Sequence, residues 1–237
     1  MVKPLIKTTG LSFSYTGDRA LLENVNFQLD AGDRAVLIGA NGSGKTTFLQ
    51  LLVGLLKPDS GSIEAFGRPR TAEKDFYDVR ARAGLLFQNP DDQLFCPTVL
   101  EDVAFGPLNL GRTFEEACGR AHRTLDLLGL SGYADSITYK LSGGEKRLVS
   151  LAAVLAMEPE VLLLDEPTAG VDEVIVERIT GILNRCDAAI LVVTHDRGFA
   201  EKITNSAFYL KDGSVEEAGQ AVEESFVSSF FHEQGSG

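Results

Sequence analysis

The chain has 237 residues, of which 44% are hydrophobic and 24% charged, and its formal net charge is -12. This length and composition allow one large domain or two intimate lobes with an extensive core, and they exclude an intrinsically disordered protein. The acidic balance disfavours nucleic acid as a partner, and we expect neither a signal peptide nor a membrane-spanning segment.

The first third of the chain predicts β-strands. Residues 5–15 and 22–29 alternate roughly between apolar and polar side chains, with a turn between them. The apolar run Ala35–Ile38 predicts a buried strand that leads into a glycine-rich loop and a helix from about Lys45 to Val53. Further elements are expected as a strand over 62–66, a helix over 71–82 and a strand over 84–87.

The middle of the chain, residues 89–158, predicts a helical subdomain. Three of its segments open with the Ser/Thr-x-x-Glu spacing of a reciprocally capped helix start. These segments are Thr98…Glu101, Thr113…Glu116 and Ser142…Glu145. The last third predicts strands over 161–164, 189–193 and 207–210, and helices over 172–185 and 197–202. This alternation favours a parallel sheet that is covered on both faces.

A phosphate-binding loop is predicted where the strand at 35–38 ends. The pattern G-x-x-x-x-G-K-[ST] is matched by Gly39, Ala40, Asn41, Gly42, Ser43, Gly44, Lys45 and Thr46, with Thr47 next. The glycines let backbone N–H groups wrap a triphosphate, while the helix N-terminus and the Lys45 ammonium supply positive charge. Because Thr46 offers a hydroxyl to Mg²⁺, the expected ligands are ATP and Mg²⁺.

Two carboxylates follow the apolar strand Val161–Leu164. Ligands of open parallel sheets lie at the carboxyl ends of the strands, so we expect Asp165 to reach the crevice of the phosphate loop and help hold Mg²⁺. Glu166 is expected to take a proton from the attacking water as general base. By themselves, two such residues more often form an ordinary surface strand end, and the phosphate loop in the same chain is what favours the functional interpretation.

In order along the chain, these motifs resemble the ATP-binding cassette (ABC) family over residues 2–219. They are the loop GANGSGKTT, Gln88, the signature Leu141, Ser142, Gly143, Gly144 and Glu145, the strand VLLLDEP, residues 169–172 and residues 194–196. The resemblance implies an α/β fold: a P-loop NTPase (RecA-like) core with a mostly parallel sheet, an N-terminal antiparallel β lobe and an inserted helical subdomain. The implied domains are a core from 1–88 and 159–217, the signature subdomain 89–158 and a short tail, 218–237.

The resemblance also implies roles for single residues. Cassettes of this family form head-to-tail dimers that sandwich two ATP molecules, with the phosphate loop of one facing the signature of the other. Tyr15 would stack on adenine, and Gln88 would sense Mg²⁺ and the attacking water. His195 would contact the γ-phosphate and orient the water, and Asp172 would cross the dimer interface.

The remaining candidate ligands predict no further site. The three cysteines, Cys96, Cys118 and Cys186, are far apart, which predicts buried thiols rather than a disulfide frame or a zinc site. His122 is expected at the surface, and His232 receives no role.

The stretch from Phe87 to Phe95, continued by residues 98–111, resembles the ATPases of energy-coupling-factor (ECF) importers. In that family, a groove beside this stretch receives a helix of the transmembrane scaffold protein, and a separate membrane subunit binds the solute. The residues expected to couple to the scaffold are Asp91, Asp92, Gln93, Leu94 and Phe95. The short extent of the chain after Gly213 favours a cobalt or nickel importer, or a biotin importer.

The expected protein is therefore an ATPase subunit that energises an ECF-type importer, peripheral on the cytoplasmic face of the cell membrane. It would work as a homodimer or with a paralogous ATPase, together with the scaffold and the solute-binding subunit. An ATPase of another ABC transporter is one alternative. A cytosolic ABC protein acting on DNA or ribosomes is another, disfavoured by the acidic charge and the absence of a coiled-coil insertion or second cassette.

Overall fold

The computed structural model describes residues 4–17 and 19–217, which form two compact units. Within these residues the first unit runs to Val79 and resumes at Ala189, and the second comprises Arg80–Ala188. Helix α2 (Glu73–Arg82) crosses the boundary between the units. The domain limits at 88/89 and 158/159 stay a prediction, and the predicted tail, 218–237, lies outside the described residues.

The first unit contains an antiparallel sheet in the order β2-β1-β4-β5. Its strands are β1 (Ile6–Phe13), β2 (Leu22–Leu29), β4 (Ser60–Ala65) and β5 (Arg68–Arg70). Alternation buries one face of the sheet, as the pattern of β2 illustrates with Leu22, Val25, Phe27 and Leu29. The sequence did not predict β5, because Arg-Pro-Arg has no apolar alternation; the strand exists through its antiparallel pairing with β4.

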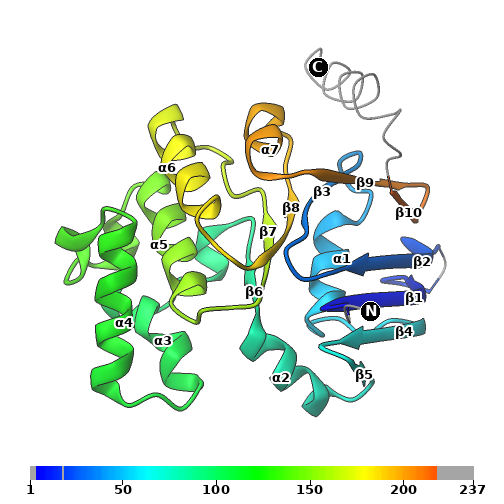
Figure 1. The fold of residues 1–237 in the computed structure, drawn as a ribbon, viewed down its shortest axis with the longest axis horizontal. Helices are drawn as coiled ribbons and strands as arrows, with labels where there is room; N and C mark the ends of the chain where they lie inside the picture. Colours follow the sequence, from blue (N-terminus) through cyan, green and yellow to red (C-terminus); the bar gives the residue numbers. More distant parts are fainter. Residues whose placement is uncertain (1–3, 18, 218–237) are drawn as a thin grey trace. The chain divides into compact units, whose positions relative to one another are not determined.

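The first unit also contains the strands that carry the phosphate loop (Figure 1). Its further elements are β3 (Arg34–Ile38), α1 (Lys45–Leu52), β8 (Ala189–Val193), α7 (Arg197–Ile203), β9 (Ser206–Lys211) and β10 (Ser214–Glu217). Strand β3 pairs in parallel with both β8 and β9, and β10 pairs antiparallel to β9. The ring of Phe27 lies edge-on to Phe48 and Phe208, with centroids 5.3 and 4.9 Å apart, and so joins β2, α1 and β9.

The second unit combines a parallel strand pair with the predicted helices. Strands β6 (Ala83–Leu86) and β7 (Val161–Asp165) pair in parallel. The helices are α3 (Val99–Asn109), α4 (Phe114–Leu127), α5 (Gly143–Leu155) and α6 (Glu173–Leu183), with 3-10 turns η1 (Pro90–Asp92), η2 (Ser131–Tyr133) and η3 (Thr138–Lys140). Helices α3 and α4 pack beside α5 (Figure 1). The predicted fold class, with its antiparallel lobe, mostly parallel strands and helical subdomain, is confirmed.

All three predicted capping boxes are confirmed, at the starts of α3, α4 and α5. In the third, the Glu145 N–H donates to Ser142 Oγ at 3.3 Å, and the Glu145 carboxylate accepts from the Ser142 N–H at 2.7 Å. This reciprocal bonding satisfies two backbone donors that a helix start leaves without intrahelical partners. It explains why these boundaries followed from local sequence.

The predictions for the cysteines and for His122 have different outcomes. No disulfide links Cys96, Cys118 and Cys186, but all three are partly exposed, so the prediction of buried thiols was wrong. Cys96 and Cys186 lie outside the helices and strands, and Cys118 lies within α4, where packing covers only one side of the helix. Burial and the charge of Asp102 raise the pKa of the Cys96 thiol to about 11, which keeps it protonated.

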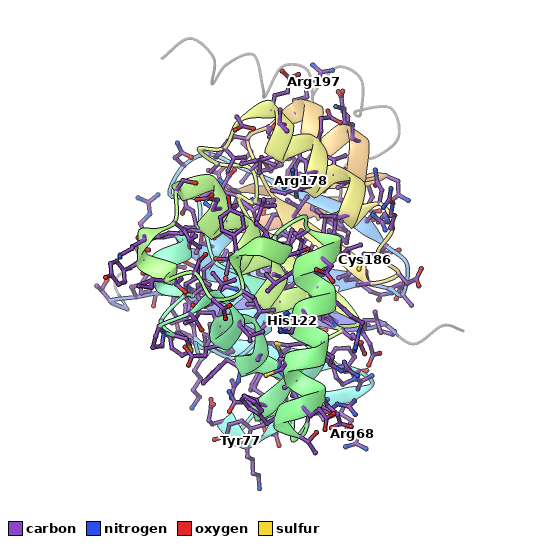
Figure 2. All side chains as sticks on the ribbon, turned by 90° about the vertical axis from the view of Figure 1, so that its left-hand side faces the viewer. Arg68, Tyr77, His122, Arg178, Cys186 and Arg197 are labelled. Atoms are coloured by element: carbon purple, nitrogen blue, oxygen red, sulfur yellow. The ribbon has the colours of Figure 1, made fainter. Side chains whose placement is uncertain are left out.

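His122 is exposed on α4, as predicted (Figure 2). Among the described residues no helix has the length and apolar character needed to cross a bilayer.

Asp102 of α3 connects the loop before this helix with the turn that precedes the signature. Its side chain is buried, with 4% of the residue exposed. Oδ1 accepts hydrogen bonds from the Phe95 and Cys96 N–H groups at 3.0 and 2.9 Å, and Oδ2 accepts from the Thr138 hydroxyl at 2.8 Å. One carboxylate therefore fixes two segments that are distant in the chain.

We predict that Asp102→Ala lowers the free energy of unfolding by roughly 3 kcal/mol, because it removes a charged acceptor from several partly buried donors. Urea denaturation measures the change. Asp126→Ala, which removes an exposed carboxylate from α4, is the control and should shift stability by no more than about 0.5 kcal/mol. Equal unfolding free energies for the two variants would contradict the role of Asp102.

Candidate nucleotide site

The phosphate loop ends in a helix that no side chain caps. Gly44 is the N-cap of α1, with φ 108°, and it offers no side chain to the first turn. By contrast, α3, α4, α5, α6 and α7 each begin with a side chain that accepts a first-turn N–H. A helix N-terminus without a capping side chain carries partial positive charge, which is the arrangement that binds phosphate.

Lys45 is folded back onto its own loop. It is 8% exposed, and its Nζ donates to the carbonyl oxygens of Gly39 at 2.6 Å and Ala40 at 3.0 Å. A Cβ at Gly39 would stand 2.5 Å from the carbonyl oxygen of Leu210, so only glycine fits there. The loop therefore wraps the ammonium group closely at the carboxyl end of β3.

Two more of the predicted nucleotide contacts lie in the same unit as the loop. Tyr15 is 64% exposed, and its hydroxyl is 3.0 Å from Thr47 Oγ1. The Tyr15 ring lies edge-on to Phe13 with centroids 4.9 Å apart, which fixes the ring. His195 follows β8 and is partly buried. Burial first, and then the positive charge of Lys45, lower the pKa of His195 below its ordinary value, so the imidazole is neutral at pH 7.

The second unit holds the two carboxylates. Asp165 ends β7 and is 3% exposed, and Glu166 is 9% exposed. The backbone of Glu166 has φ 49°, in the left-handed region that is uncommon for residues other than glycine. Strained backbone of this kind clusters at functional sites, which supports a special position for this residue.

Gln88 is exposed, and the backbone around it is held by α5. Arg147 donates from Nη1 to the Phe87 carbonyl oxygen at 3.0 Å and from Nη2 to the Gln88 carbonyl oxygen at 2.6 Å. The Gln93 side chain donates to the Ser150 carbonyl oxygen at 2.8 Å and accepts from the Phe87 N–H at 3.2 Å. The segment that carries Gln88 is thus fastened to the signature helix.

The five residues predicted to couple to a membrane subunit differ in exposure. Asp91, Asp92 and Phe95 are exposed, and Asp91 pairs with Lys146 at 2.6 Å. Leu94 is only 9% exposed, and Gln93 is partly exposed with its amide bonded inside the unit, so both are less accessible than the other three. Phe95 lies edge-on to Phe105, with centroids 4.8 Å apart. Further exposed apolar side chains of the second unit are Leu108, Leu110 and Phe114.

The signature begins helix α5. Ser142 and Gly143 are exposed, Leu141 and Gly144 are partly exposed, and a Cβ at Gly144 would stand 2.5 Å from Ile175 Cδ1. Hydrogen bonds from Tyr133 and from Ser142 lower the pKa of Glu145. Asp172 caps α6 by accepting from the Ile175 N–H at 2.9 Å. Ile175 therefore adjoins both the signature and the start of α6.

Arg147 is the residue of this region that the sequence analysis left without a role. A signal was present, because Arg147, Leu151 and Val154 follow helical spacing and are all buried. A charged residue on the apolar stripe of a helix is rarely buried without compensating partners. This signal was missed because Lys146 and Arg147 are adjacent, and a pair of basic residues is typical of an exposed surface.

We predict that the imidazole of His195 titrates below pH 6.5, the ordinary value for histidine. Protonation of this side chain should therefore be complete only at a lower pH than in an unfolded chain. Lys45→Ala should move the titration toward the ordinary value, since it removes the repulsive charge but leaves the burial. NMR titration of the imidazole proton, assigned by its loss in His195→Gln, tests both shifts, and a midpoint above 6.5 contradicts the geometry.

Comparison with known protein sequences gives a consistent result over nearly the whole chain. A family profile described as ABC transporter matches residues 22–169, more than half of the 237 residues. A putative ABC transporter ATP-binding protein of Brucella suis is 52% identical over 214 residues, which cover 90% of this chain and 89% of the relative. The energy-coupling factor transporter ATP-binding protein EcfA of Methanocaldococcus jannaschii is 40% identical over 219 residues, covering 91% of this chain and 78% of the relative.

Solved structures of similar fold extend the comparison. The cbiO1 protein from Clostridium perfringens, described as part of the ABC transporter complex cbiONQ, superposes with a TM-score of 0.81 at 34% identity. The match covers 93% of this chain and 90% of that protein. The ATP-binding cassette MJ0796, described as a dimer in a post-hydrolysis state bound to ADP and Pi, superposes with a TM-score of 0.82 at 28% identity. This match covers 90% of this chain and 97% of MJ0796.

Proposed function

Because the chain belongs to the ABC transporter family and is an ABC-type ATPase, an ATP-binding subunit of a transporter, we propose that it energises an ECF-type importer. The proposed nucleotide contacts are Tyr15, residues 39–47, the signature and His195. The observation that carries the proposal is the start of α1, where Gly44 offers no capping side chain and the helix N-terminus presents the partial positive charge that binds phosphate.

The proposed hydrolysis uses groups of this chain in separate roles. The loop N–H groups and the Lys45 ammonium bind the phosphates, and the exposed ring of Tyr15 stacks on adenine. The water oxygen attacks the γ-phosphorus, its proton passes to the Glu166 carboxylate, and ADP leaves with its electron pair. Neutral His195 orients the water and contacts the γ-phosphate.

The residues present fit Mg²⁺. The Thr46 hydroxyl, the Asp165 carboxylate and the Gln88 side-chain amide are oxygen donors, the type that this hard cation prefers. We propose that these three residues hold the ion. When bound, Mg²⁺ neutralises charge on the β- and γ-phosphate oxygens.

A second copy of this chain or a paralogue is proposed to complete each site. Exposed Ser142 and Gly143 stand at the N-terminus of α5, where the Ser142 hydroxyl accepts from the Glu145 N–H and leaves the N–H groups of Gly143 and Gly144 to attract an anion. The description of MJ0796 as a dimer supports a pair of cassettes. In this arrangement the signature of one cassette meets the γ-phosphate bound by the other, and Asp172 crosses the interface.

We predict that Glu166→Gln binds ATP, hydrolyses it at least about 100-fold more slowly and accumulates an ATP-dependent dimer, because the general base is lost while the phosphate contacts remain. Phosphate release and size-exclusion chromatography with light scattering measure the two effects. Glu64→Gln, which makes the same change at an exposed position of β4, should resemble the unmodified protein. A monomeric Glu166→Gln protein saturated with ATP would argue against the sandwich dimer.

The proposed membrane partners are a transmembrane scaffold protein and a solute-binding subunit, with this chain peripheral on the cytoplasmic face. Support comes from the exposed edge-on pair Phe95 and Phe105, which offers an apolar surface to a partner helix. The likeness to EcfA and to cbiO1 supports the same kind of complex. We propose cobalt or nickel ions as the solute, with biotin as the alternative.

We predict that Phe95→Glu retains basal ATPase activity within about twofold but loses co-purification with the scaffold, because a charge replaces apolar contact area. Leu55→Glu places the same charge at another exposed apolar residue and should leave assembly intact. Leu94 is unsuitable for this test, since a charge at a buried position would unfold the loop. An assembled complex containing Phe95→Glu would exclude this surface as the scaffold contact.

A further inference from the structure

We propose that Arg147 is a positioning residue that couples the two nucleotide sites of the dimer, because its guanidinium joins the signature helix to the Gln88 segment of the same cassette. The signature serves the nucleotide held mainly by the partner, and Gln88 serves the cassette's own nucleotide. The inference thus rests on the proposed sandwich dimer. It assigns a function to a buried charge that neither catalysis nor metal binding uses.

The hydrogen bonds of Arg147 define the connection. Nη1 and Nη2 reach two consecutive carbonyl oxygens, those of Phe87 at 3.0 Å and Gln88 at 2.6 Å. A planar guanidinium with both terminal nitrogens engaged fixes the direction as well as the position of the segment it holds. Any movement of α5 is therefore transmitted to the backbone of Gln88.

Burial makes this connection stiff. Arg147 is 4% exposed, so water cannot replace the two carbonyls as acceptors. Donors withdrawn from water hold their remaining acceptors strongly, because breaking such a bond leaves an unsatisfied buried group. The Gln93 amide forms a second connection between the same two segments, because it bonds both the Phe87 N–H and the Ser150 carbonyl oxygen.

The charge of Arg147 also acts on the carboxylates. Burial lowers the pKa of Arg147, and the charges of Asp165 and Glu166 act in the opposite direction. The guanidinium therefore lies within electrostatic range of Asp165, which ends β7, and of Glu166, which follows it. It offsets part of their negative charge, which would otherwise repel a triphosphate.

The position of Arg147 in α5 links these properties to the signature. It lies little more than one helical turn after Ser142 and Gly143, which begin the helix. An anion bound at that N-terminus attracts the helix along its axis. The adjacent Lys146 faces the exposed Asp91 instead, so of these two cations Arg147 is the one bonded to the Gln88 backbone.

The test compares Arg147→Met, Arg147→Lys and Arg120→Gln in the full chain. Methionine fills much of the same space but removes the charge and the donors, whereas lysine keeps the charge without the planar pair of donors. Arg120→Gln is the matched control, since Arg120 is another partly buried arginine, paired with Glu158 at 2.7 Å. Each variant is assayed for kcat, KM and the Hill coefficient of ATP hydrolysis, for ATP affinity by calorimetry, and for thermal unfolding.

For Arg147→Met we expect kcat to fall between about 10- and 100-fold, as for a misplaced catalytic group, with the Hill coefficient approaching one. ATP affinity should stay within about threefold, because the phosphate loop is untouched. Arg147→Lys should recover part of kcat, and Arg120→Gln should match the unmodified protein. An Arg147→Met protein that does not unfold cooperatively is not properly folded. In that case, kcat and the Hill coefficient of Arg147→Lys test the inference.

A folded Arg147→Met or Arg147→Lys protein with kcat and Hill coefficient equal to those of the unmodified chain would overturn the inference. A parallel loss of kcat and ATP affinity would do so too, because it would indicate a purely structural role. The ATP-dependent dimerisation of Glu166→Gln distinguishes a failure of the proposed sandwich dimer from a failure of the coupling through Arg147. If that variant fails to dimerise with ATP, the sandwich itself fails, whereas a normal trap with unaffected Arg147 variants removes only the coupling.

Discussion

Binding a triphosphate requires a chain of net charge -12 to create positive potential at one place. The start of α1 provides it through backbone donors that no side chain caps and through the Lys45 ammonium folded over its own loop. These groups bind phosphate only if their positions are fixed. The pairing of β3 with its neighbouring strand and the packing of Phe27 against Phe48 of α1 hold the loop and the helix in place. The same requirement explains the glycine at position 39, where the loop lies against Leu210.

The second unit faces the opposite electrostatic problem, because Asp165 and Glu166 are buried carboxylates. Burying such groups is costly unless a compensating charge lies near them. The guanidinium of Arg147 is within electrostatic range of both, and it is itself held by two backbone carbonyls. A buried ion of this kind adds little net stability, and its contribution is better understood as control of geometry.

Helix α5 unites several parts of the second unit. Its first residues form the signature, Lys146 bonds Asp91, and Arg147 and Ser150 hold the segment from Phe87 to Gln93. Asp102 adds a connection between the loop at Phe95 and the turn at Thr138 that leads into the signature. Hydrogen-bonded segments therefore connect the apolar surface at Phe95 to the start of α5 at Ser142. Transmission of a partner's movement would require such a connection.

Local sequence determined much of this protein, because caps and phosphate loops are built from residues that are neighbours in the chain. Thr98 with Glu101, and Ser142 with Glu145, bond within four residues, and glycines set the loop from Gly39 to Gly44. The polar edge strands β5 and β10 were missed, since pairing with β4 and β9 creates them. Tertiary packing alone decided that Leu94 is buried and Phe95 exposed, and that Lys146 faces Asp91 while Arg147 is bonded to the Gln88 backbone. Adjacent residues of similar chemistry carry no local signal of their direction, because that direction is set by partners from distant segments.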